Sequence, residues 1–203
     1  MTTPEKQESH GDPEQALREI QRKLQIIARD YSAGKLNSAQ FNALYRHYNE
    51  QASVIRHMLR QNPGGDAWRT AASSGRTTFL RDQFEARIMF YVVFRHGERQ
   101  PLVAGGKLPQ KVAEQVHKLL RSLWAMEKPR TGLARKSLGD GVWLLLVVGE
   151  HSLTISIYHM QPSSEQATRV RELHAEFERL NRAALERRLT SNRMIFPQRA
   201  LLE

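Results

Sequence analysis

The stretch VWLLLVVGEHSLTISIYH, residues 142–159, decides the fold of this chain. Its first seven residues are continuously apolar, which is typical of a strand that is covered on both faces. Gly149 and Glu150 then offer a tight reversal. From Ser152 to Tyr158 apolar and polar residues alternate, so one face of that segment is apolar and the other polar. We therefore predict a β-hairpin with one buried strand and one half-exposed strand.

The composition indicates a soluble protein with a real core. Apolar residues make up 40% of the 203 positions, charged residues make up 26%, and the mean hydropathy is −0.57. The chain contains no cysteine, which excludes disulfides, a thiol nucleophile and cysteine-based metal sites. No apolar signal-peptide region begins the chain, and no window approaches the roughly 18 apolar residues of a membrane span. We expect a cytoplasmic protein without a membrane span.

The net charge of +10 is concentrated in the middle of the chain. Residues 51–136 hold 16 Lys or Arg against 6 Asp or Glu, whereas residues 1–50 hold 7 of each kind. Such a basic segment attracts an acidic protein, an anionic lipid or nucleic acid, or it is a solvated face without a partner. Without a recognisable reading motif, we expect any nucleic-acid binding to be weak and strongly salt-dependent.

The N-terminal third predicts a helical hairpin over residues 12–61, after a disordered polar tail over residues 1–11. Asp12 and Pro13 suit the start of a first helix, and Asn37 with Gln40 resembles the capping box of a second. Apolar residues recur at spacings of three and four along both helices. Residues 62–78 are rich in Gly, Ser and Pro, so we predict a linker there, anchored at most by Trp68.

The remaining chain predicts an α+β domain over residues 79–189. Strands are expected over residues 88–95 and 100–104, a helix over residues 108–126, and a third strand over residues 133–138 before the central hairpin. Ser163 and Gln166 resemble the capping box of a long last helix. The apolar stripe expected on that helix comprises Val170, Leu173, Phe177, Leu180 and Ala184. Residues 190–203 are interpreted as a basic, irregular tail.

This order of elements resembles the roadblock/LC7 and longin group of α/β domains, which are also profilin-like. The resemblance implies a five-stranded antiparallel sheet with helices, preceded here by the helical hairpin. One departure is that a roadblock domain begins with a helix directly before its first strand, and residues 79–86 are short for that role. Similar domains dimerise, scaffold complexes and regulate small GTPases without catalytic residues of their own.

The resemblance also implies the function and the surface that performs it. We expect a non-enzymatic interaction or scaffold module that forms a homodimer and serves a small GTPase or another signalling protein. Roadblock-like domains pair through the middle helix and the third strand. The corresponding residues, together with the surplus of apolar positions on the middle helix, give the candidate interface: Val112, Val116, Leu119, Leu120, Leu123, Leu133 and Leu138.

One motif suggests an enzyme instead. Residues 95–101, RHGERQP, resemble the signature of histidine acid phosphatases, which would make His96 the nucleophile and Arg95 and Arg99 the phosphate clamp. A polar turn between two strands explains the same residues, and only 54 residues separate His96 from His151, which is too few for that family's domain. We therefore predict no catalytic residues, and the phosphatase stays an alternative.

The remaining histidines show no metal-ligand spacing, and no phosphate-binding loop is present, so no metal or cofactor is expected.

Overall fold

The computed structural model describes residues 12–73, 75–126 and 129–202. The chain divides into two compact units, Met1–Phe84 and Glu85–Glu203. Each unit has a hydrophobic core of its own. Within the described residues, no helix has the length and apolar character needed to cross a membrane.

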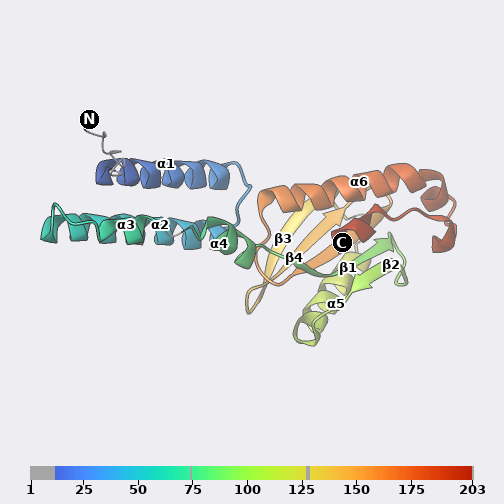
Figure 1. The fold of residues 1–203 in the computed structure, drawn as a ribbon. Helices are drawn as coiled ribbons and strands as arrows, with labels where there is room; N and C mark the ends of the chain where they lie inside the picture. Colours follow the sequence, from blue (N-terminus) through green and yellow to red (C-terminus); the bar gives the residue numbers. More distant parts are fainter. Residues whose placement is uncertain (1–11, 74, 127–128, 203) are drawn as a thin grey trace. The chain divides into compact units, whose positions relative to one another are not determined.

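The first unit is built on the predicted helical hairpin (Figure 1). Helix α1 (Pro13–Ser32) is capped by Asp12, whose side chain accepts a hydrogen bond from the backbone N–H of Glu14. Helix α2 (Ser38–Gln61) begins with the predicted capping box, in which Asn37 and Gln40 each accept from the other's backbone N–H. The two helices bury their apolar stripes against each other, as their spacing predicts.

The structure differs from the predicted linker over residues 62–78. Two short helices, α3 (Trp68–Ala72) and α4 (Thr77–Gln83), form in and just after this region. Trp68 is buried in the hairpin core, and Arg81 pairs with Asp30 at 2.6 Å. Composition does not reveal these long-range contacts, because Gly and Ser predict only local backbone freedom.

The second unit contains the predicted five-stranded antiparallel sheet. Its strands are β1 (Ile88–Arg95), β2 (Pro101–Gly106), β3 (Gly132–Gly139), β4 (Val142–Val148) and β5 (Ser152–Tyr158), in the spatial order β2-β1-β5-β4-β3. All four neighbouring pairs are antiparallel. The fold class is therefore α+β, with β5 at the centre and β2 and β3 at the two edges.

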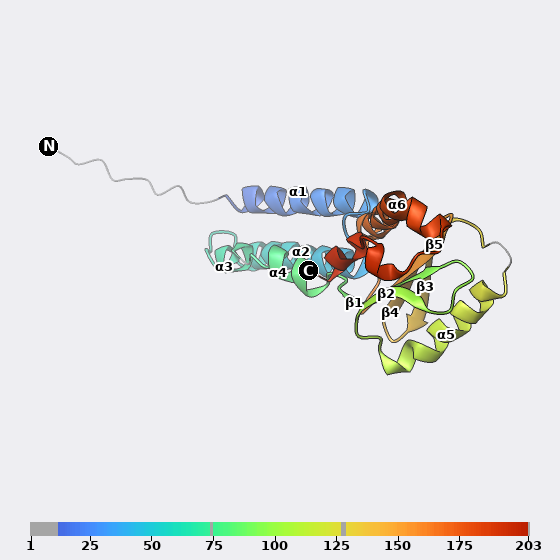
Figure 2. The ribbon, with the colours of Figure 1, turned by 90° about the vertical axis from the view of Figure 1, so that its right-hand side faces the viewer.

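Helices cover both faces of this sheet (Figure 2). Helix α5 (Gln110–Trp124) packs on the face that carries the even-numbered residues of β4, and α6 (Ser164–Glu186) packs on the other. Strand β4 is consequently buried from both sides, as its continuous apolar run predicts. The predicted half-exposed strand is wrong, because all seven residues of β5 are buried. The cause is the central position of β5 beneath α6, where its polar residues face the helix.

The C-terminal segment also differs from the predicted irregular tail. Two short 3₁₀ helices, η1 (Ser191–Arg193) and η2 (Pro197–Leu201), follow α6. Asn181 holds this segment, because its side-chain amide donates to the carbonyl of Ile195 and accepts from the backbone N–H of the same residue. Phe196 stacks on Phe177 with ring centroids 5.4 Å apart. The segment therefore belongs to the core on the α6 face of the sheet.

Candidate interaction surface

The structure places most of the predicted interface inside the core of a single copy. Helix α5 lays its apolar face on the sheet, so most of these side chains already have partners in this chain. Those buried are Val112, Val116, Leu120, Leu123 and Leu138. Leu119 and Leu133 remain partly exposed. Pairing with a second copy is not tested by this arrangement and stays a prediction.

Strand β3 is the part of the predicted surface that remains open. It lies at one edge of the sheet and pairs on one side only, with β4. An edge strand presents a row of backbone N–H and C=O groups that another strand can pair with. Most of its side chains are exposed, including those of Arg135 and Lys136. Between Pro129 and Gly139 the chain carries three basic residues and no acidic one, so this edge is positively charged.

A hollow of about 560 Å³ lies beside the first half of β3. It opens between the C-terminal end of α5 and the α5 face of the sheet, and its apolar wall includes Leu123, Met126 and Val148. Met126 is 53% exposed although its side chain is apolar. Arg130 also lines the hollow and supplies a positive charge. The hollow is shaped to take an apolar side chain from a segment that lies along β3.

The opposite edge strand, β2, is less suited to pairing. It begins at Pro101, which has no backbone N–H to donate, and it ends at Gly105 and Gly106. A Cβ at Gly106 would lie 2.3 Å from the carbonyl oxygen of Met89, and Gly106 has a φ of +78°. Only glycine tolerates that backbone conformation at so close an approach. Proline and irregular backbone are common ways of blunting an exposed edge.

The RHGER stretch does not assemble a phosphate clamp. Arg95 is buried, and its guanidinium donates to Glu98 at 2.7 Å and to the carbonyl of Leu189 at 2.6 Å. Arg99 lies over the ring of Trp124 on the α5 face, 5.9 Å from its centroid. The ring Nε2 of His96 donates to the carbonyl of Gly149 at 3.0 Å. The structure therefore brings His96 next to the β4–β5 turn, but it leaves the two arginines engaged elsewhere.

A partly buried carboxylate holds the β4–β5 turn against α6. Glu178 accepts hydrogen bonds from the backbone N–H groups of Glu150, His151 and Ser152, at 2.8 to 3.0 Å, and from the hydroxyl of Ser152 at 2.7 Å. Burial alone would raise the pKa of Glu178, but these hydrogen bonds and the neighbouring His174 lower it below the ordinary value. A Cβ at Gly149 would lie 2.4 Å from the same carboxylate, so glycine permits this close approach. We call Glu178 with its four donors the Glu178 clasp.

His174 lies beside the clasp. Together with Thr154 and Glu178 it forms a hydroxyl–imidazole–carboxylate series that resembles a catalytic triad. Its Nδ1 is hydrogen bonded to the hydroxyl of Thr154 at 2.8 Å, and its Nε2 is 3.7 Å from Glu178. Burial lowers the pKa of His174 to about 4, so the ring is neutral at pH 7. Thr154 is fully buried and His174 is 2% exposed, so no substrate reaches either side chain. Among the described residues, no group of three or more His, Asp or Glu side chains could hold a metal ion.

Sequence reasoning missed these residues because it placed the buried face of α6 too far around the helix. The buried positions include the polar residues His174 and Asn181, whereas Leu180 of the predicted stripe is 40% exposed. A stripe of apolar residues cannot by itself show that polar side chains also lie on the helix face that packs against the sheet. The available signal was Thr154 on the polar face of β5, because a hydroxyl covered by a helix calls for a polar partner there, and His174 supplies it.

Comparison of the chain with protein-family models, with curated proteins and with solved structures finds no match.

Proposed function

We propose that this protein is a non-enzymatic protein–protein interaction module that docks a partner along the open edge of β3. The observation that carries the proposal is a positively charged edge strand, paired with β4 on one side and with no described strand on the other, with an apolar hollow directly beside it. A partner segment that adds a strand to the sheet gains main-chain hydrogen bonds, and a side-chain pocket next to the edge adds specificity. The hydrogen bonds of the Glu178 clasp and the burial of Ser152, Thr154 and His174 support a structural role for the polar residues that resemble an active site.

The charge of the β3 edge indicates an acidic, extended partner segment. Arg130, Arg135 and Lys136 are all exposed, and acidic residues on the added strand would complement them. Of these three, only Arg135 has a polar side-chain contact with another residue that the structure describes, the hydroxyl of Ser164 at 3.3 Å. An apolar residue on the same segment would enter the hollow beside Met126. The proposed occupant is thus a strand that combines acidic residues with at least one apolar side chain.

A second copy of the chain is the competing occupant, as the homodimer prediction requires. In a symmetric antiparallel pair centred on Arg135 or on Lys136, that residue of one copy would lie opposite the same residue of the other. Like charges directly opposite each other destabilise a strand pair. Basic side chains on an edge strand also discourage self-association in general. We therefore favour an acidic partner over a second copy at this edge. The roadblock-like element order suggests a small GTPase or another signalling protein as that partner.

Two synthetic peptides test the proposal by isothermal titration calorimetry with the full chain. One alternates glutamate and valine over nine residues, and the other replaces each glutamate by lysine. We expect the acidic peptide to bind and the basic peptide to bind at least about tenfold more weakly. Lys136→Glu should remove most of this preference. Lys107→Glu, an exposed charge beside the other edge strand, provides the matched control and should leave the preference intact.

Light scattering on the same protein separates the two occupants. A monomer that binds the acidic peptide supports the proposal. A stable dimer that binds neither peptide would contradict it and favour a second copy at the β3 edge. Equal binding of both peptides would also contradict it, because the charge of the edge would then have no influence.

A further inference from the structure

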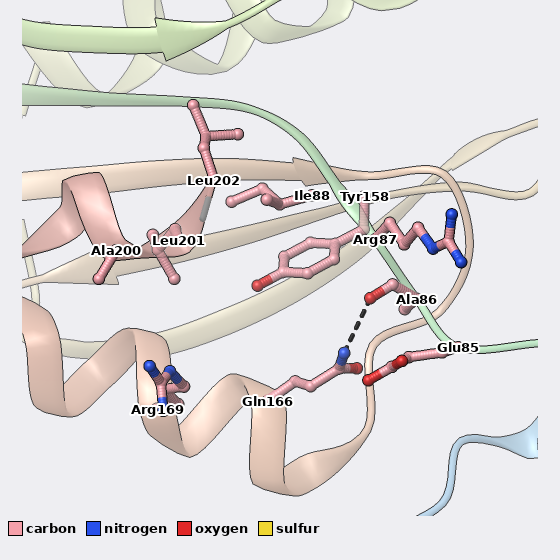
Figure 3. Close-up of a pocket in the computed structure, with 10 residues that line it drawn as sticks. All are labelled: Glu85, Ala86, Arg87, Ile88, Tyr158, Gln166, Arg169, Ala200, Leu201 and Leu202. Carbon is pink, nitrogen blue, oxygen red and sulfur yellow. Dashed lines mark hydrogen bonds between the residues drawn. The ribbon is translucent and has the colours of Figure 1, made fainter. Parts of the chain in front are cut away.

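A pocket of about 480 Å³ lies at the other end of the sheet, on the α6 face (Figure 3). Its walls come from four segments of the second unit: the start of β1, the end of β5, the first turns of α6 and the C-terminal segment. The volume falls within the range of small-molecule sites, which runs from about 300 to 1,000 Å³. None of its lining residues belongs to the β3 edge or to the Glu178 clasp.

Tyr158 places a hydroxyl group in this pocket (Figure 3). The residue is only 4% exposed, and within the described part of the chain its hydroxyl has no hydrogen-bond partner. The hydroxyl oxygen itself is not enclosed, because it opens onto the pocket, where a ligand can reach it (Figure 3). Burial raises the pKa of Tyr158 to about 12, so the phenol stays protonated and can donate a hydrogen bond. Figure 3 shows this hydroxyl pointing into the pocket, toward the side where Arg169 and Leu201 lie.

The charged residues of the pocket favour an anion at that side. Arg169 stands on α6 and Arg87 on the segment before β1, and neither guanidinium forms an ion pair with the residues that the structure describes. In Figure 3 the guanidinium of Arg87 extends away from the tyrosine hydroxyl, so Arg169 is the cation nearer to the unpartnered donor. The first turn of α6 adds the positive end of a helix dipole. Glu85 supplies one negative charge at the opposite side, and the two arginines outweigh it.

The floor of the pocket is apolar and held in place. Ala86, Ile88 and Leu201 belong to the core on this face of the sheet, and they also line the pocket. Gln166 fixes the wall, because its side-chain amide donates to the carbonyl of Ala86 at 2.8 Å while its oxygen caps α6. The apolar floor distinguishes this site from a simple surface cluster of basic residues. A ligand here would bury an apolar body and present its charge to Arg169.

We propose that this pocket binds a small organic carboxylate with an apolar body, whose oxygens accept hydrogen bonds from the Tyr158 hydroxyl and the Arg169 guanidinium. The planar fork of arginine matches a carboxylate in geometry, and the phenol supplies a further donor at the buried end. The ligand's alkyl or aryl part would lie on Ile88 and Leu201. This site is independent of partner docking at β3, since the two share no residues.

Hexanoate is a suitable probe, with hexanol and inorganic phosphate as controls that lack the charge or the apolar body. We expect hexanoate to bind the full chain with a Kd on the order of 1 mM, measured by NMR titration. Both controls should bind at least about tenfold more weakly, because hexanol has no negative charge for Arg169 and phosphate has no apolar body for the floor of the pocket. Equal binding by hexanol or by phosphate would overturn the proposal, as would no detectable binding of hexanoate.

Three substitutions locate the binding. Tyr158→Phe keeps the buried ring and removes the hydroxyl, and it should weaken hexanoate binding about fivefold to tenfold. Arg169→Ala removes an exposed side chain and should weaken binding by about tenfold or more. Arg171→Ala is the matched control, because Arg171 is an exposed arginine on the same helix that does not line the pocket, and binding should stay within about twofold of wild type. Undiminished binding in both Tyr158→Phe and Arg169→Ala would overturn the assignment.

Discussion

The Glu178 clasp and the β3 edge both involve polar groups of the same sheet. At the clasp these groups are hydrogen bonded to a side chain of the same unit, whereas at the outer side of β3 no described strand pairs with them. At the clasp, one carboxylate takes up three backbone N–H groups of the β4–β5 turn and one hydroxyl. At the β3 edge, a row of backbone groups and three basic side chains face outward. The residues that resemble catalytic motifs therefore bond to one another within the fold, whereas the strand without such a motif keeps an open edge, which is where we propose that a partner docks.

The strongest test of this contrast removes the carboxylate of the clasp. Glu178→Ala leaves the turn N–H groups and the Ser152 hydroxyl without their acceptor, so we expect the free energy of unfolding to fall by about 3 kcal/mol. Glu176→Ala is the matched control on the same helix. Its carboxylate is exposed and lies 3.8 Å from Arg179, so its loss should change stability by less than about 0.5 kcal/mol. Chemical denaturation measures both, and equal effects would show that Glu178 contributes no more than a surface charge.

The buried histidine beside the clasp predicts a specific pH dependence. The folded pKa of His174 is about 4, below the ordinary value of 6.5, so the unfolded chain binds a proton that the folded chain excludes. Stability is therefore unaffected by this group above pH 6.5 and falls as the pH drops from 6.5 toward 4, by up to about 3 kcal/mol. The lowered pKa of Glu178 adds a further loss only below about pH 4.5.

His174→Gln should flatten the stability profile between pH 6.5 and pH 4.5. Glutamine cannot titrate, and its amide can still bond to Thr154. Denaturation midpoints at several pH values measure the slope, and the profile at pH 7.5 provides the reference where the wild-type ring is neutral in both states. An unchanged slope in the variant would show that another group causes the loss.

Substitution of His96 tests whether the RHGER stretch is structural. His96→Ala removes one hydrogen bond to the carbonyl of Gly149, so we expect a loss of about 1 kcal/mol of stability. We expect no change in the hydrolysis of p-nitrophenyl phosphate, because Arg95 and Arg99 are engaged with other residues. Hydrolysis by the wild type that disappears in the variant would reverse this interpretation and restore the phosphatase.

The smallest effect on stability is expected at the β3 edge. Lys136 is exposed and has no ion-pair partner among the described residues, so Lys136→Glu should change the free energy of unfolding by less than about 0.5 kcal/mol. The same substitution should remove most of the preference for an acidic peptide. Denaturation and peptide titration on one protein sample give both values. A large loss of stability would show that Lys136 serves the fold instead.

The sequence predicts the strands and long helices well, because their signals are local. The apolar run of β4 and the capping boxes at Asn37 and Ser163 each specify an element within a few residues. The burial of β5, the helices around Trp68 and the ordered C-terminal segment depend on contacts between distant segments, so local patterns could not predict them. For the surface, the family resemblance pointed to the third strand, which the structure places at an edge of the sheet, and its part in an interface stays a prediction. It could not show that most of the apolar face of α5 is used by the sheet.

Hydrogen exchange at the two edge strands tests docking at β3 most directly. The acidic peptide is added to the full chain, and the backbone amides of β3 and β2 are followed in the same experiment. Our account predicts that exchange slows for amides within residues 132–139, because a docked strand takes up the N–H groups that point away from β4, while residues 101–106 are unchanged. Binding that leaves the exchange of β3 unchanged, or that protects β2 instead, would contradict it.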